Sequence, residues 1–431
     1  MLGAILRAVT TTVTTTMATM MVVGWLALWS ACGAAMPPVP GKGGPAWIEL
    51  TSEHFTVWTD GPPDRGRELI REMERLWQIV AGVVFPGVDS SGRDLVIVFR
   101  DDDELSALSP TGEPRAYAMS AQPPLWQPAF VLSAFSNREV GDRTVAHELT
   151  HAISFAVVHH QPRWLAEGMA EYFETVELDP DRTTADIGAA PQYRGQPILM
   201  AHLVPIARLF TWDAPGKNES REYSTAWALF TFLINEHRAE LVHYMQLLGG
   251  SFDLVATEED RVARAWSAAF PSLPLSTVDA VLQQWLVTGH HLVLHVDVQL
   301  RARPVTERGL GDADVYALRG LLHARIASHE AQAHQDMTAA LAAEPTNVLA
   351  RILSVALDQA KLTPEAGRAL TAAHEDDWRA WLLATMALSD VPGNEAEAQA
   401  ARGRACELIA ANRALVPPAA LCRRASGQPS P

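Results

Sequence analysis

The sequence predicts an α+β fold, and three features of its residue pattern support this. Residues 47–59 alternate apolar and polar side chains, which is typical of one or two half-buried strands. Short apolar runs predict a central strand at 94–100 and a further strand at 128–135, and helical spacing predicts a helix at 64–84. From Val140 onward the apolar spacing is almost entirely helical. Strands followed by a long run of helices favour an α+β arrangement.

Length and composition exclude several classes of protein. A chain of 431 residues suggests two or three domains, at roughly 150 residues each. Its 34 Lys and Arg residues against 50 Asp and Glu give a formal charge of −16. This argues against nucleic acid as a partner, because binding to nucleic acid needs a basic stripe. With 48% hydrophobic residues the chain is not a disordered polymer, and three cysteines are too few for a disulfide scaffold.

The first 32 residues have the pattern of a targeting segment. A basic start at Arg7 precedes an uncharged stretch at 8–29, and small residues then precede Cys32. This resembles a bacterial lipobox, so we expect export to the cell envelope and a membrane anchor on a lipidated Cys32. A cleaved signal without lipid is one alternative, and an uncleaved anchor spanning a bilayer of about 30 Å is the other. Residues 33–45 are rich in Pro and Gly and predict a linker.

An Ala-rich helical tail is predicted over residues 301–425. Residues 339–353 resemble residues 368–382, with Ala350 matching Ala380. Such a repeat favours stacked helical hairpins of the tetratricopeptide type, although its period is shorter than the usual value of about 34 residues. A plain helical bundle is the alternative. Cys406 and Cys422 lie within this tail, either as a disulfide pair or as two free buried thiols.

One short motif carries metal chemistry. Residues 145–151 read V-A-H-E-L-T-H, so His147 and His151 project from the same face of a helix. This spacing lets two imidazole nitrogens reach one Zn²⁺ at about 2.0–2.1 Å. Glu148 lies beside them and can take the proton of a zinc-activated water. The alternative is two histidines on a helix face with a solvated glutamate.

A second segment supplies a candidate third ligand. Residues 162–174 read P-R-W-L-A-E-G-M-A-E-Y-F-E, and Glu167 and Glu171 share one face of the predicted helix. A catalytic zinc site needs three protein ligands and an open position, and Glu167 is the candidate for the third ligand. Glu171 can accept a hydrogen bond from a ligand histidine and fix its tautomer, unless it is simply a solvated helix charge.

Together, H-E-L-T-H at 147–151 and W-L-A-E-G-M-A-E-Y at 164–172 resemble the gluzincin metallopeptidases, most closely the bacterial peptidase MA-like proteins. The resemblance implies a zincin-like catalytic domain at 46–200, completed by a helical subdomain at 201–300. It also implies one Zn²⁺ per chain. The connection between the two motifs is a little shorter than in aminopeptidase N-like enzymes. The implied metal ligands are His147, His151 and Glu167, with Glu148 as the general base.

Residues 222–233 resemble the helix that carries a catalytic tyrosine in these families. The match places that role on Tyr223, whose phenol would hydrogen-bond the developing oxyanion. The alternative is a tyrosine that caps a buried helix. No G-x-M-E-N segment is present, and residues 116–119 are only faintly similar to it, so exopeptidase action is not supported. A strand at 128–133 is instead predicted to bind an extended peptide by edge pairing.

The sequence therefore predicts an exported, membrane-tethered zinc peptidase that acts on a peptide or protein substrate. The helical tail is expected to offer a surface for a protein partner. The alternative is a catalytically inactive zinc-domain and helical-repeat binding protein of the cell envelope. Hydrolysis of a non-peptide amide, such as one in cell-wall material, would use the same metal chemistry.

Overall fold

The computed structural model describes residues 37–85, 93–110, 116–119, 129–133, 138–158, 160–179, 181, 183–190, 203–213, 219–249, 257–288, 292–298, 304–358, 361–389, 391–411 and 422. The predicted targeting segment and Cys32 lie outside these residues. None of the helices in these ranges combines the length and the apolar character needed to span a bilayer. The α+β fold class is confirmed.

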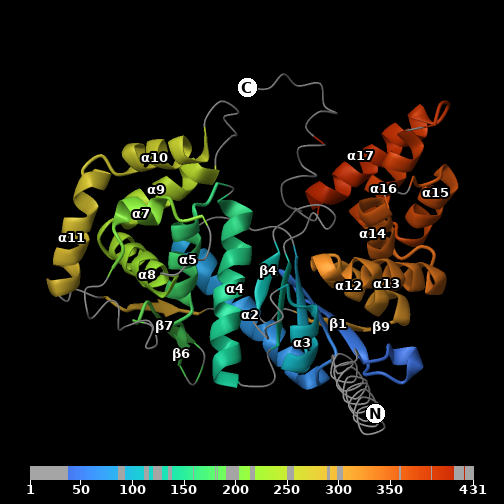
Figure 1. Ribbon diagram of the computed structural model, residues 1–431, viewed down its shortest axis with the longest axis horizontal. Coiled ribbons are helices and arrows are strands. Elements are labelled where there is room, and N and C mark those ends of the chain that lie inside the picture. Colours follow the sequence, from blue (N-terminus) through green and yellow to red (C-terminus); the bar gives the residue numbers. More distant parts are fainter. Residues whose placement is uncertain are drawn as a thin grey trace, which may run out of the picture.

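A six-stranded mixed sheet forms the centre of the fold, in the order β4-β5-β3-β2-β1-β9 (Figure 1). Strands β2, β3 and β5 are parallel, and β1, β4 and β9 pair antiparallel with their neighbours. The predicted central strand is confirmed, because every residue of β3 is buried. The bounds are β1 Trp47–Thr51, β2 Phe55–Thr59, β3 Asp94–Phe99, β4 Tyr117–Met119, β5 Ala129–Ser133 and β9 Thr306–Leu310.

The expected edge strand is not at an edge. We predicted that residues 128–133 would be free to pair with an extended peptide. That prediction is wrong, because β5 is hydrogen-bonded to β4 on one side and to β3 on the other. The short strand β4 ends the sheet instead. Its three residues were too few to show an alternating pattern in the sequence.

Side chains of β3 alternate between two hydrophobic cores, one on each face of the sheet. Val96 and Val98 point into the larger core, whereas Leu95, Ile97 and Phe99 point into the smaller one. Helices α2 (Pro63–Val84), α4 (Arg138–Val157) and α5 (Arg163–Phe173) contribute to the larger core. A strand that is buried on both faces explains why residues 94–99 read as a continuous apolar run.

The smaller core joins the predicted tail to the sheet. It is completed by α12 (Asp312–His323), α13 (Glu330–Ala343) and α14 (Val348–Asp358), and β9 pairs with β1 along its full length. The sequence placed the start of a separate tail at residue 301. The structure instead builds this segment into the sheet domain. Strand β9 reads T-E-R-G-L and is mostly exposed, so its residues gave no strand pattern to detect.

Residues 201–300 are predominantly helical, as the sequence predicted, but they also contain a strand. Strand β8 (Leu294–Asp297) pairs with β7 (Thr184–Ile187), which in turn pairs with β6 (Glu177–Leu178), to form a second small sheet. This corrects the prediction of an all-helical subdomain. The helices are α7 Ile206–Phe210, α8 Glu219–Glu236, α9 Arg238–Gly249, α10 Glu258–Ala269 and α11 Leu275–Thr288.

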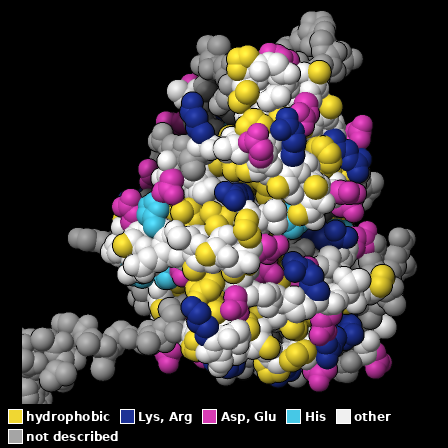
Figure 2. Space-filling view, turned by 90° about the vertical axis from the view of Figure 1, so that its right-hand side faces the viewer, with side chains coloured by type: hydrophobic (Ala, Val, Ile, Leu, Met, Phe, Trp, Pro, Cys, Tyr) yellow, Lys and Arg dark blue, Asp and Glu magenta, His cyan; other side chains and the backbone are white. Residues whose placement is uncertain are grey.

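The last helices of the chain pack as consecutive neighbours. They are α15 (Pro364–Ala373), α16 (Trp378–Ser389) and α17 (Glu395–Ala411). Helices α7–α11 lie on one side of α4 and the sheet, and α12–α17 lie on the opposite side (Figure 1). Across the face of the tail, acidic and basic side chains are interspersed with small apolar patches (Figure 2).

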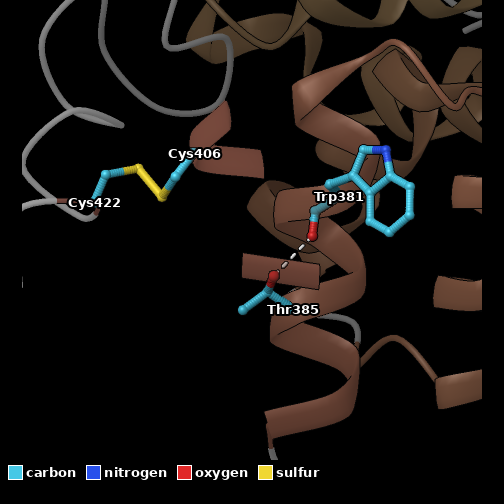
Figure 3. The surroundings of a disulfide bond; sticks show 4 residues. All are labelled: Trp381, Thr385, Cys406 and Cys422. Atoms are coloured by element: carbon cyan, nitrogen blue, oxygen red, sulfur yellow. Dashed lines mark hydrogen bonds between the residues drawn. A yellow bond between two sulfur atoms is a disulfide. The ribbon is translucent and has the colours of Figure 1, made fainter. Parts of the chain in front are cut away.

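Cys406 of α17 forms a disulfide with Cys422, so the two cysteines are a disulfide pair and not two free thiols (Figure 3).

A buried polar cluster lies where the sheet meets α12. Nη2 of Arg319 lies 3.6 Å from Oε1 of Glu104, which belongs to the short helix α3 (Asp102–Leu108). Burial and the neighbouring charge of Asp60 raise the pKa of Glu104 to about 8, against the opposing effect of Arg319. Burial also raises the pKa of Asp60, so this pair of carboxyls binds a proton more tightly in the folded chain than in the unfolded chain.

Leu318→Ala should destabilise the whole sheet domain, because Leu318 is only 1% exposed in the core between sheet and tail. We expect a loss of about 2–5 kcal/mol in the free energy of unfolding, measured by denaturant titration. Leu292→Ala is the matched control, since Leu292 is 58% exposed, and should change stability by less than about 0.5 kcal/mol. Equal effects of the two substitutions would show that the tail is not part of this domain.

Glu104→Gln should reduce the pH dependence of stability. The folded chain binds the Glu104 proton more tightly than the unfolded chain, whose carboxyl has a pKa near 4.5. This group's stabilisation is therefore present below pH 4.5 and is lost as the pH rises toward 8. Glutamine removes that contribution, although the buried Asp94, whose pKa is also raised to about 8, retains its own. Urea titrations across this pH range should show a shallower slope than wild type, and the exposed Glu259→Gln should leave the slope unchanged.

Candidate metal centre

Helix α4 places the two motif histidines one turn apart at the side of the larger core. Leu149 and Ile153 on the same helix are buried in that core and fix the rotation of the helix. His147 and His151 consequently face the same way, with 3.2 Å between their Nε2 atoms. The ring of Phe155, one further turn along, stacks on His151 at a centroid distance of 5.5 Å. The predicted pair is therefore brought together.

Helix α5 brings Glu167 to the same point. Oε2 of Glu167 lies 3.5 Å from Nε2 of His147 and 3.4 Å from Nε2 of His151. The helix is buried from Trp164 to Phe173, and Gly168 lets it approach α8 closely. A Cβ atom at Gly168 would lie only 2.5 Å from the carbonyl oxygen of Ala226, so a larger residue would push the two helices apart.

These three atoms have the spacing and the chemistry of a metal-binding set. Ligand atoms about 2.0–2.1 Å from a tetrahedral Zn²⁺ are separated from one another by about 3.3–3.4 Å. The three observed separations are 3.2, 3.4 and 3.5 Å. Oε2 of Glu167 is buried without a hydrogen-bond partner, as is Nδ1 of His151. Two imidazole nitrogens and one carboxylate oxygen therefore fit a metal ion at their centre.

The carboxylate that orients His147 is that of Glu174. Its Oε2 lies 3.1 Å from Nδ1 of His147. A proton on Nδ1 leaves the lone pair of Nε2 pointing toward His151 and Glu167, which is the tautomer that a metal ligand needs. The sequence had assigned this role to Glu171, whose buried carboxylate lies within 4.8 Å of His147 and Glu174. Glu174 stands two helical turns beyond Glu167, and this spacing was a signal that could have identified it.

Charges within the cluster raise the pKa of His147 and lower the pKa of Glu167. Burial disfavours a protonated His147, but contacts with Glu167 and Glu174 outweigh burial and raise its pKa well above the usual value. Burial likewise disfavours an ionised Glu167, yet the two histidines lower its pKa below the ordinary range. Glu167 is therefore a carboxylate at neutral pH, and its negative charge favours a cation at this position.

The two predicted catalytic side chains border the same cluster. Glu148 is half-buried on α4, and its charge acts on His147. Tyr223 is half-buried on α8 and receives a hydrogen bond from Nη2 of Arg163, 3.4 Å from its hydroxyl. The same Nη2 lies 3.2 Å from Oε1 of Glu167. Burial and the charge of Glu167 raise the pKa of Tyr223, so the phenol keeps its proton and can act as a donor.

Comparison with known proteins gives no family for this chain. No protein-family model matches the sequence, and no curated protein is similar to it. What is known of the site is therefore the identity of its residues and their geometry.

Glu174→Gln should weaken metal binding without unfolding the chain. An amide can still accept from Nδ1 of His147, but without the negative charge that fixes the ligand tautomer. We expect about 10- to 100-fold lower affinity for Zn²⁺, measured by competition with a chromophoric chelator. Glu177→Gln is the matched control, because Glu177 is exposed on β6 just after the site. Affinities that agree within twofold for both variants would remove Glu174 from the metal centre.

Proposed function

We propose that this chain is a zinc-dependent peptidase of zincin-like fold. The observation that carries the proposal is the convergence of His147, His151 and Glu167, whose ligand atoms lie 3.2–3.5 Å apart. The chemistry of the set supports zinc, because two imidazoles and one carboxylate are a common ligand set of catalytic zinc sites. Such sites have three protein ligands and one open position, and the described residues supply three.

The residues around the ligands fit the hydrolysis of an amide. When bound, Zn²⁺ would supply Lewis acidity that activates water and polarises a carbonyl. Glu148 would accept a proton from the attacking water and then deliver it to the leaving nitrogen. Tyr223 would donate its O–H to the carbonyl oxygen as negative charge grows there. Three metal ligands alone would also fit a zinc ion with a purely structural role. Glu148 lies beside the ligands and is not needed to bind the metal, so its presence favours a catalytic role.

The proposal includes the cellular setting that the sequence indicates. Residues 1–32 favour export and a membrane anchor at Cys32, and the disulfide between Cys406 and Cys422 is consistent with an oxidising compartment. A peptide or protein would be the substrate. Helices α15–α17 extend away from the metal centre and offer a surface for a protein partner (Figure 1). A zinc-containing binding protein is the competing function, and it would not depend on Glu148.

Glu148→Gln separates these two functions. The amide cannot take a proton from water, so hydrolysis should fall by about 10²- to 10⁴-fold or more, while zinc remains at one per chain. Hydrolysis would be followed with a mixture of peptides and zinc by elemental analysis. His147→Ala is the companion variant and should lose both zinc and hydrolysis. A Glu148→Gln protein that cleaves peptides at the wild-type rate would exclude the proposed role of Glu148.

A further inference from the structure

Arg163 connects the third ligand to the candidate oxyanion donor. It occupies the first turn of α5, one turn before Glu167 on the same face. Its Nη2 lies 3.2 Å from Oε1 of Glu167 and 3.4 Å from the hydroxyl of Tyr223. One nitrogen therefore joins two side chains that are carried by different helices, α5 and α8.

An aromatic side chain holds the guanidinium in place. The ring of Trp212 lies 4.7 Å from Cζ of Arg163, within the range of a cation–π contact. The same ring packs edge-on against Tyr223, with 5.2 Å between the centroids. Nε of Arg163 is buried and has no hydrogen-bond partner among the described residues. A buried donor that is left unsatisfied costs free energy, so this arrangement is held by the remaining contacts of the side chain.

We propose that Arg163 is a positioning residue that sets the orientation of both Glu167 and Tyr223. By binding Oε1, it turns the other oxygen of Glu167 toward the two histidines. Because Arg163 donates a hydrogen bond to the phenol oxygen of Tyr223, the O–H of Tyr223 points away from Arg163. Because one nitrogen makes both contacts, a shift of Glu167 is passed on to Tyr223. This inference rests on the proposed function, since it assigns Arg163 to the same site.

The test is a double-mutant cycle of Arg163→Met and Tyr223→Phe, with zinc affinity measured separately by chelator competition. Arg163→Met alone should lower zinc affinity by about 10-fold, as loss of an outer hydrogen bond to a ligand commonly does. At saturating zinc it should still lower kcat by about 10-fold or more, with little change in KM. In the Tyr223→Phe background the same substitution should change kcat by less than about threefold, because the two groups act as a unit.

Further variants separate this role from a merely structural one. Arg163→Lys keeps the charge and should restore zinc affinity at least partly, but it lacks the planar guanidinium that lies over Trp212 and should not hold Tyr223 in place or restore kcat. It also serves if Arg163→Met does not fold. Arg368→Met is the matched control, because Arg368 pairs with Glu397 on the tail in a similar ion pair. It should change neither quantity.

Each outcome has a defined meaning. Unchanged zinc affinity in Arg163→Met, or effects on kcat that simply multiply in the double variant, would overturn the role of Arg163. Equal kcat for Arg163→Lys and wild type would also overturn the coupling to Tyr223. If wild-type protein binds zinc but cleaves nothing, the proposed function fails. The zinc affinities of the variants would still test the contact between Arg163 and Glu167.

Discussion

The site depends on holding two imidazole nitrogens and one carboxylate oxygen within 3.5 Å of one another in a largely buried place. Burial disfavours these polar groups, and without a metal ion the raised pKa of His147 favours a proton on that ring, which offsets the negative charge of Glu167. The fold must therefore hold these groups together. It does so by packing α4 into the core beneath the sheet and by clamping α5 between α4 and α8, where Gly168 permits close contact. A metal ion at the centre would take the place of that proton, and a hydrogen bond from Nδ1 of His147 to Glu174 would leave Nε2 free to bind it.

The same constraint gives the helical tail a structural role. Helix α4 packs against one face of the sheet, and the apolar second face of that sheet needs a cover. Helices α12–α14 provide that cover, and β9 protects the edge of β1. The segment from β9 to α14 is thus a component of the sheet domain that carries the candidate metal centre. Helices α15–α17 lie outside this shared core; α15 and α16 pack on the other side of α14 in one small core, and α16 and α17 form two more.

Features that depend on local spacing could be predicted from the sequence, and features that depend on tertiary contact could not. His147 and His151 are one turn apart on one helix, so their convergence follows from helix geometry alone. Glu167 was a candidate because a catalytic zinc site needs a third protein ligand, and the resemblance to the gluzincins implied the same role. Glu174 was missed although its spacing from Glu167 pointed to the same face, because it is the C-cap residue of α5 and the sequence gives no firm helix boundary there. The contact between Arg163 and Tyr223 joins residues 60 apart and depends on how α5 meets α8. Strand β9 was missed because its exposed side chains show no apolar alternation.

We propose that the cluster of His147, His151 and Glu167 binds zinc and that the bound zinc serves to hydrolyse peptide bonds. The most direct measurement is a digest of a broad peptide library by the purified protein, followed by mass spectrometry, before and after zinc is removed with a chelator. We predict cleavage by the zinc-loaded protein, loss of cleavage after chelation and recovery when zinc is added back. A protein that retains one zinc per chain and cleaves no peptide would contradict the claim, and cleavage that persists without metal would contradict it equally.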